Sequence, residues 1–218
     1  SPWMQKLPGG LIHVNVVGCA LFAAISGSSA ATVATVGKMS IPELRKRKYP
    51  EKILLGSLAG SGTLGLLIPP SIILIIYGVT VQESIAKLFI AGIIPGIMIA
   101  LIFMSYVIIW SLINKKSMPK YVENFSFLEK IKKSKQLLPV IILISAVIGS
   151  IYTGVATATE AASLGVVGAL ILSYFQKSLT TETFKQSLLG ATKTSCMIAF
   201  ILAGSTFLSL AMGFTGLP

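Results

Sequence analysis

Neutral oxygen atoms, and not charged groups, are the candidate ligands that this sequence places inside its apolar segments. Candidate hydroxyl groups cluster at two points, in the uncharged runs 7–37 and 53–77. The residues that we single out are Ser26, Ser28, Ser29, Thr32, Thr63 and Ser71. No carboxylate accompanies them, so a divalent cation bound there would be poorly neutralised. Hydroxyl and carbonyl oxygens instead suit a monovalent cation, which has one charge to neutralise.

The second of these runs contains a predicted break in a membrane-spanning helix. The run 53–77 is long enough to cross a bilayer, but Pro69 and Pro70 remove two backbone donors and clash with the preceding turn. We therefore expect the helix to break near 65–70 and to restart at about Pro70. The break would leave carbonyls free for a cation and N–H groups near Ile72 free for a carboxylate. A proline kink that binds nothing is the alternative.

Other kinds of site find little support in the sequence. The only histidine, His13, has no Asp or Cys beside it, and we expect a polar residue at the membrane interface. Cys19 and Cys196 lie in apolar runs without metal-ligand spacing, so we expect reduced, buried thiols. A Walker A motif is not visible, which argues against ATP hydrolysis, and no ligand set for zinc or calcium stands out.

The composition is that of a multi-pass membrane protein. Hydrophobic residues make up 54% of the 218 residues and charged residues 11%, with a mean hydropathy of +0.85. The net charge is +11, but the basic residues lie in short segments between apolar runs. That pattern is typical of cytoplasmic loops and argues against a nucleic-acid partner. The start, Ser1-Pro2-Trp3, is not a natural one, so we expect a fragment.

Residues 11–37 are predicted to form a re-entrant helical hairpin. The centre of this segment is small and polar, which suits close packing and not lipid contact. Gly27 permits a turn, and Ser28 or Ser29 can cap a second helix. The chain would leave along 30–37, so both ends of the hairpin would lie on one side of the membrane. A single continuous span is the alternative.

The segments that follow fit one topology. The basic segments 38–52 and 114–135 are expected to be cytoplasmic, the second as a linker between structural repeats with a short surface helix. An outer loop over 78–87 would join the broken helix to a span over 88–113. All Lys and Arg residues except Lys87 then fall on the cytoplasmic side, which supports the topology.

Residues 136–218 are expected to supply further helices. The predicted elements are spans over 137–153 and 158–175, an amphipathic helix over 177–193 capped by Thr180 or Thr181, and a last span over 194–212. Glu160 is the only charge in the segment that holds the first two spans. We expect it to stabilise a helix N-terminus beside Thr157 and Thr159. An ionisable group in a membrane segment is also a functional candidate.

Several motifs, in this order along the chain, resemble one family of membrane transporters. They are Leu7-Pro8-Gly9-Gly10-Leu11, residues 22–32, Gly62-Thr63-Leu64-Gly65 with Leu67-Ile68-Pro69-Pro70-Ser71, Leu88-Phe89-Ile90-Ala91-Gly92 with Ile94-Pro95-Gly96, and Thr153-Gly154 with Thr159-Glu160-Ala161-Ala162. Together they resemble the large membrane subunit of tripartite ATP-independent periplasmic (TRAP) transporters, although Ala158 stands where that family more often has Pro. The family's subunit is roughly twice as long, with inverted repeats, so a second hairpin and a second broken helix would be absent here.

The resemblance implies an all-α polytopic fold of the ion-transporter type, with inverted repeats and incomplete here. Residues 1–113 would form the transport (elevator) part, 114–135 the linker, and 136–218 scaffold helices of the second repeat. It also implies sodium-coupled import of a carboxylate-bearing solute by an elevator movement. The partners would be a small membrane subunit and a periplasmic substrate-binding protein, at the bacterial cytoplasmic membrane. A non-transporting scaffold and an ion channel are the alternatives.

The site residues expected from these considerations form two groups. The sodium site would be Ser26, Gly27, Ser28, Ser29, Thr63, Gly65 and Ile68. The substrate site would be Thr32, Pro70 and Ser71. We expect no catalytic residue, no cofactor and no metal other than sodium.

Overall fold

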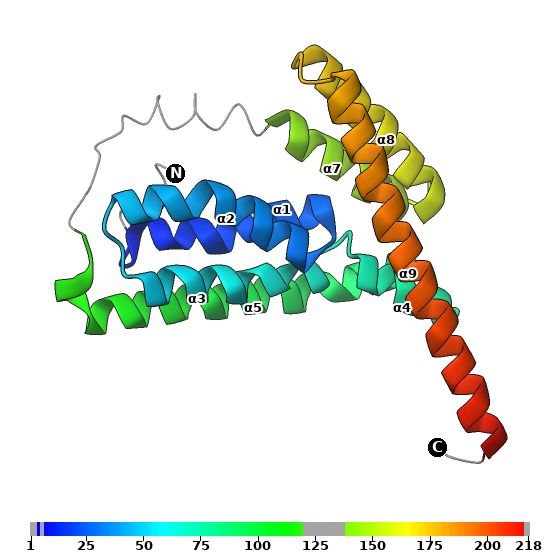
Figure 1. Cartoon of the computed structure of the whole chain (residues 1–218), viewed down its shortest axis with the longest axis horizontal. Helices are drawn as coiled ribbons and strands as arrows, with labels where there is room; N and C mark the ends of the chain where they lie inside the picture. The colour runs from blue at the N-terminus through cyan, green and yellow to red at the C-terminus, as the bar shows by residue number, and fades with distance from the viewer. Residues whose placement is uncertain (1–3, 5–6, 120–137, 216–218) are drawn as a thin grey trace. The chain divides into compact units, whose positions relative to one another are not determined.

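The computed structural model describes residue 4 and residues 7–119 and 138–215, and all regular structure in these residues is helical. Figure 1 shows the elements in chain order. They are η1 (Gly10–Ile12), α1 (His13–Ser26), α2 (Ser29–Lys46), α3 (Glu51–Gly62), η2 (Thr63–Leu66), α4 (Ile72–Thr80), α5 (Ile85–Ile113), η3 (Lys115–Ser117), α7 (Leu138–Tyr152), α8 (Ala158–Phe175) and α9 (Thr181–Thr215). The chain divides into two compact units, Ser1–Gly165 and Val166–Pro218.

Helices α1 and α2 form an antiparallel hairpin and not one continuous helix. They lie side by side (Figure 1). Leu11, at the start of the hairpin, and Leu44, near the end of α2, belong to one buried cluster. Helix α2 continues to Lys46, well beyond the predicted exit limb 30–37. The extension arises because residues 43–46 are good helix formers, and the helix accommodates Pro42.

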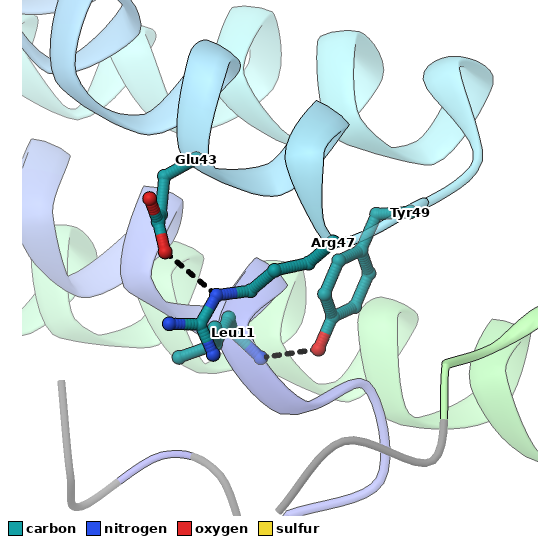
Figure 2. A network of polar contacts seen from close by, with 4 residues as sticks. All are labelled: Leu11, Glu43, Arg47 and Tyr49. Carbon is teal, nitrogen blue, oxygen red and sulfur yellow. Dashed lines mark hydrogen bonds and ion pairs between the residues drawn. The ribbon is translucent and has the colours of Figure 1, made fainter. Parts of the chain in front are cut away.

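The open end of the hairpin is closed by contacts with the segment that joins α2 to α3. The hydroxyl of Tyr49 accepts a hydrogen bond from the Leu11 N–H at 3.1 Å (Figure 2). Gly10 has a φ of 53°, and a methyl group there would lie 2.6 Å from that hydroxyl. Arg47 Nε donates to Glu43 at 2.7 Å in the same view. This hydrogen bond holds the pKa of the exposed Glu43 carboxyl below its usual value.

The predicted helix break is present. Helix α3 ends at Gly62, one turn of 3-10 helix follows, and α4 begins only at Ile72. Helix α5 then runs back along the whole of this broken element. A methyl group at Gly78 would meet Leu88, and one at Gly60 would meet Phe103. The α5 helix starts at Ile85, earlier than predicted, because the Ser84 hydroxyl accepts from the Lys87 N–H and caps it.

Helices α7 and α8 occupy the segments predicted for two spans. The Thr157 N–H and hydroxyl both donate to the Glu160 carboxylate at 2.8 Å, and the Glu160 N–H donates back to the Thr157 hydroxyl at 3.3 Å. This reciprocal pattern is a capping box, so the predicted capping role of Glu160 is confirmed. Phe89, Ile151 and Ala161 form a small buried cluster.

Helix α9 differs from the prediction of two separate helices over 177–193 and 194–212. It is one helix from Thr181 to Thr215, because the polar residues around Lys193 are compatible with helix and no proline interrupts them. The Thr180 hydroxyl accepts from the Thr183 N–H, which confirms the predicted cap. Cys196 is exposed, contrary to prediction, because no residue of α9 is buried. Cys19 is buried as predicted.

Among the residues that the structure describes, three helices are long and apolar enough to cross a membrane: α5, α8 and α9. The predicted surface helix in 114–135 falls largely outside the described residues, which end at 119 on this side. The division into transport part, linker and scaffold stays a prediction.

Candidate functional site

Two residues form the turn of the hairpin, one in the left-handed and one in the extended backbone conformation. Gly27 follows α1 with a φ of 58°, in the left-handed region that a glycine adopts without strain. Ser28 is extended, and its side chain accepts from the Ala31 N–H at 3.4 Å, which makes it the N-cap of α2. The predicted turn and the predicted capping by Ser28 are both confirmed.

Three side-chain and backbone oxygens gather directly behind this turn. The Ser28 carbonyl accepts from the Thr32 hydroxyl at 2.7 Å, from the Thr32 N–H at 3.0 Å and from the Ser26 hydroxyl at 3.2 Å. The Ser26 and Thr32 hydroxyl oxygens lie 2.9 Å apart. Thr32 is completely buried. We call Ser26 Oγ, the Ser28 carbonyl oxygen and Thr32 Oγ1 the oxygen cluster.

The turn is in direct backbone contact with the helix break. The Ile72 N–H, the first of α4, donates to the Gly27 carbonyl at 3.3 Å. A methyl group at Gly27 would lie 3.0 Å from the Pro70 carbonyl oxygen, and one at Gly65 would lie 3.1 Å from the Ser29 nitrogen. A side chain at either position would press on the facing backbone, so the two glycines allow the turn and the break to approach closely.

The start of α4 is occupied differently from the prediction. The Ile72 N–H was expected to be free, but the Gly27 carbonyl accepts its hydrogen bond. Ser71 is completely buried and stands at the N-cap position without capping α4. Its hydroxyl donates to the Leu66 carbonyl at 2.8 Å, which closes the break upon itself.

The structure brings together most, but not all, of the residues expected in the two sites. The hairpin turn, Gly65 and Pro70 meet as described. Thr32, expected beside the substrate, lies in the oxygen cluster instead. Thr63 is exposed and its hydroxyl donates to the Gly60 carbonyl of its own helix at 2.7 Å. Ile68 faces α5, where a methyl group at Gly96 would lie 3.0 Å from its Cγ1.

The sequence did not predict that two polar residues of α1, His13 and Asn15, are buried. His13 is completely buried, not interfacial as predicted, because its Nε2 donates to the Pro8 carbonyl at 2.8 Å and so satisfies that nitrogen. Asn15 is also completely buried and donates to the Leu54 carbonyl at 3.2 Å and to Ser57 Oγ at 3.0 Å. A polar residue within an apolar run is the signal that could have identified Asn15.

Comparison with known proteins supplies the family. Residues 4–218 match the family model described as "Tripartite ATP-independent periplasmic transporter, DctM component". A C4-dicarboxylate TRAP transporter large permease protein of Pseudomonas aeruginosa is 36% identical over 90% of this chain and 46% of its own length. An isethionate TRAP transporter permease protein of Oleidesulfovibrio alaskensis is 34% identical over 99% of the chain and 34% of its own length.

A third relative carries another solute in its name. The sialic acid TRAP transporter permease protein of Haemophilus influenzae is 35% identical over 91% of this chain and 32% of its own length. The chain therefore spans at most about half the length of these relatives. The three are about equally similar to it although they are named for different solutes. The match across nearly the whole chain shows that it belongs to the DctM component family of tripartite ATP-independent periplasmic transporters.

Proposed function

We propose that this chain is part of a sodium-coupled secondary transporter that imports a carboxylate-bearing solute. The observation that carries the proposal is the oxygen cluster at the hairpin turn, pressed against a helix break. Such breaks are tolerated within a membrane where they line a cavity or are buried in protein. Secondary transporters bind anionic substrates and coupling cations with discontinuous helices of this kind.

Sodium fits the oxygen cluster better than a divalent cation does. The cluster offers two hydroxyl oxygens and one carbonyl oxygen within hydrogen-bond distance of one another. Within the described residues, no group of three or more His, Cys, Asp or Glu side chains could hold a metal ion. If a cation bound there, the hydroxyl hydrogens of Ser26 and Thr32 would point away from it. Further ligands would come from backbone carbonyls of Gly27, Ser29, Gly65 and Ile68, with Thr63 the least well placed of the expected residues.

The substrate carboxylate would bind at the start of α4. Because Ser71 does not cap this helix, the N–H groups after Ile72 in its first turn are the available donors. Pro70 and Ser71 border this position, and Thr32 borders it from the oxygen cluster. The positive end of the helix dipole adds to the attraction for an anion.

The contact between the turn and α4 supplies a route for coupling. A cation that orders residues 26–29 also fixes the Gly27 carbonyl, which accepts from the first N–H of α4. The substrate would then bind a helix end that is already oriented, and the two ligands would strengthen each other's binding. By the same linkage, substrate would raise the affinity for sodium.

The remaining parts of the proposal follow from the family. The hairpin would be re-entrant and, with the broken helix, would lie in a transport part over 1–113 that precedes the second of two inverted repeats. Residues 114–135 would form a cytoplasmic linker, and 136–218 scaffold helices past which the transport part moves as an elevator. A small membrane subunit and a periplasmic binding protein that delivers the solute would complete the transporter in the bacterial cytoplasmic membrane.

Sodium titrations of thermal unfolding test the cation site in the purified full-length permease. We expect sodium chloride, but not choline chloride, to raise the unfolding midpoint of the wild type. Thr32→Val and Ser26→Ala should raise the half-saturating sodium concentration by roughly 5- to 150-fold, since each removes a hydroxyl ligand of the cation. Thr32→Ser keeps the hydroxyl and serves as the matched control. Equal responses to sodium and choline in the wild type would refute the proposal.

A further inference from the structure

Gly92 of α5 lies directly against the backbone of the helix break. A methyl group at Gly92 would lie 2.7 Å from the Leu67 carbonyl oxygen and 3.1 Å from Leu74 Cδ1. The first of these distances is shorter than any ordinary contact between a methyl carbon and an oxygen. A side chain at position 92 would therefore require the break or α5 to move.

The Leu67 carbonyl belongs to the helix break, which packs between α5 and the hairpin turn. Within the described residues, no N–H or O–H group donates to this carbonyl. The Leu67 N–H donates to the Leu64 carbonyl at 3.1 Å, which ties it to the turn that contains Gly65. Gly65 in turn contacts the backbone of Ser28 and Ser29. The break is thus held between the hairpin turn on one side and Gly92 on the other.

We propose that Gly92 is a positioning residue for the cation site. Because Gly92 has no side chain, α5 can pack directly against the Leu67 carbonyl. This contact fixes the position of the break and therefore the distance between Gly65 and the hairpin turn. The inference rests on the proposed function, since it assumes that sodium binds between the turn and the break. Gly92 itself contacts no bound ion in this account.

Gly56 provides a matched control for a glycine-to-alanine change in a helix. A methyl group at Gly56 in α3 would meet nothing within 4 Å. A methyl group at Gly92, by contrast, would force the Leu67 carbonyl or α5 to move.

The experiment is a sodium titration of the unfolding midpoint of the purified full-length permease, with choline chloride as the ionic-strength control. Gly92→Ala should raise the half-saturating sodium concentration by roughly 5- to 50-fold, as expected for misplaced polar ligands. Gly56→Ala should stay within about twofold of the wild type. A purely structural role would lower the sodium-free midpoint of Gly92→Ala and leave its half-saturating concentration unchanged, and that result would overturn the inference.

A double variant keeps the inference testable if Gly92→Ala folds poorly. It also separates the contact of Gly92 with Leu67 from its contact with Leu74. Leu74→Ala combined with Gly92→Ala removes the side-chain clash but keeps the clash with the Leu67 carbonyl. Its half-saturating concentration should stay raised relative to Leu74→Ala alone, and recovery to that control would refute the role of Leu67. If the wild type and Thr32→Val behave as proposed while Gly92→Ala matches the wild type, only this inference fails. If sodium has no specific effect on the wild type, both proposals fail.

Discussion

At the scale of single residues, buried backbone groups in this chain depend on individual side chains. The Leu11 N–H lies at the start of the hairpin, where no helical carbonyl precedes it, and it is satisfied by the Tyr49 hydroxyl. Tyr49 is 7% exposed and packs with Leu44 and Ile53 in the same cluster. One hydroxyl therefore ties the entrance of the hairpin to the connection between α2 and α3.

Tyr49→Phe should destabilise the full-length permease by about 1–3 kcal/mol, since it leaves the buried Leu11 N–H without an acceptor. Thermal unfolding in detergent would measure this as a lower midpoint, with the sodium response retained. Tyr77→Phe is the matched control, because Tyr77 is 54% exposed on α4. Equal midpoints for Tyr49→Phe and wild type would show that this hydrogen bond contributes nothing.

Local rules account for the parts of the site that could be predicted from the sequence. Gly27 and Ser28 were identified because a turn needs a left-handed residue and a helix start needs a cap. The pairing of Gly27 with Ile72 could not be predicted, because the two residues are far apart in the sequence and meet only through packing. The same holds for Leu67 and Gly92. The hydroxyl of Thr63 was expected at the site, but its own helix offers a nearer acceptor.

At the scale of elements, helix boundaries were predicted well where strong signals mark them. The start of α8 has the Thr157–Glu160 capping box, and its bounds agree with the predicted span. The bounds of α2 and α9 were missed because charged residues were interpreted as the end of a helix. Charge marks the edge of the membrane, however, and a helix can continue beyond that edge.

The capping box predicts how Glu160 responds to substitution. Glu160→Gln keeps a side-chain acceptor for the Thr157 N–H, so solute uptake should stay within about twofold of the wild type. Succinate and sialic acid serve as the probes, in cells that carry the whole transporter. Thr157→Ala should destabilise the permease by about 1 kcal/mol, as is usual for a lost N-cap. Loss of uptake in Glu160→Gln with normal amounts in the membrane would instead assign Glu160 a role in transport.

At the scale of the whole chain, α5 shows how long the broken helix beside it is, because the two run side by side. It runs antiparallel to α3 and α4, with Gly60 beside Phe103, the break beside Gly92 and Gly78 beside Leu88. Its 29 residues give a length of about 44 Å at 1.5 Å per residue. That exceeds the hydrocarbon thickness of a bilayer, about 30 Å. The broken element beside it is therefore long enough to reach from one membrane face to the other.

This length leads to a test of the orientation in the membrane. Lys46, at the end of α2, precedes the start of α3, and Gln82 follows the end of α4, so the two lie at opposite ends of the broken element. Both are exposed. The basic residues around Lys46 predict that this end of the broken element faces the cytoplasm.

Full-length permease variants Lys46→Cys and Gln82→Cys, without Cys19, Cys196 or other cysteines, can be exposed to a membrane-impermeant maleimide. Intact cells should label only Gln82→Cys, and lysed cells should label both. Labelling of Lys46→Cys in intact cells would reverse the orientation and place the open end of the hairpin at the periplasmic face.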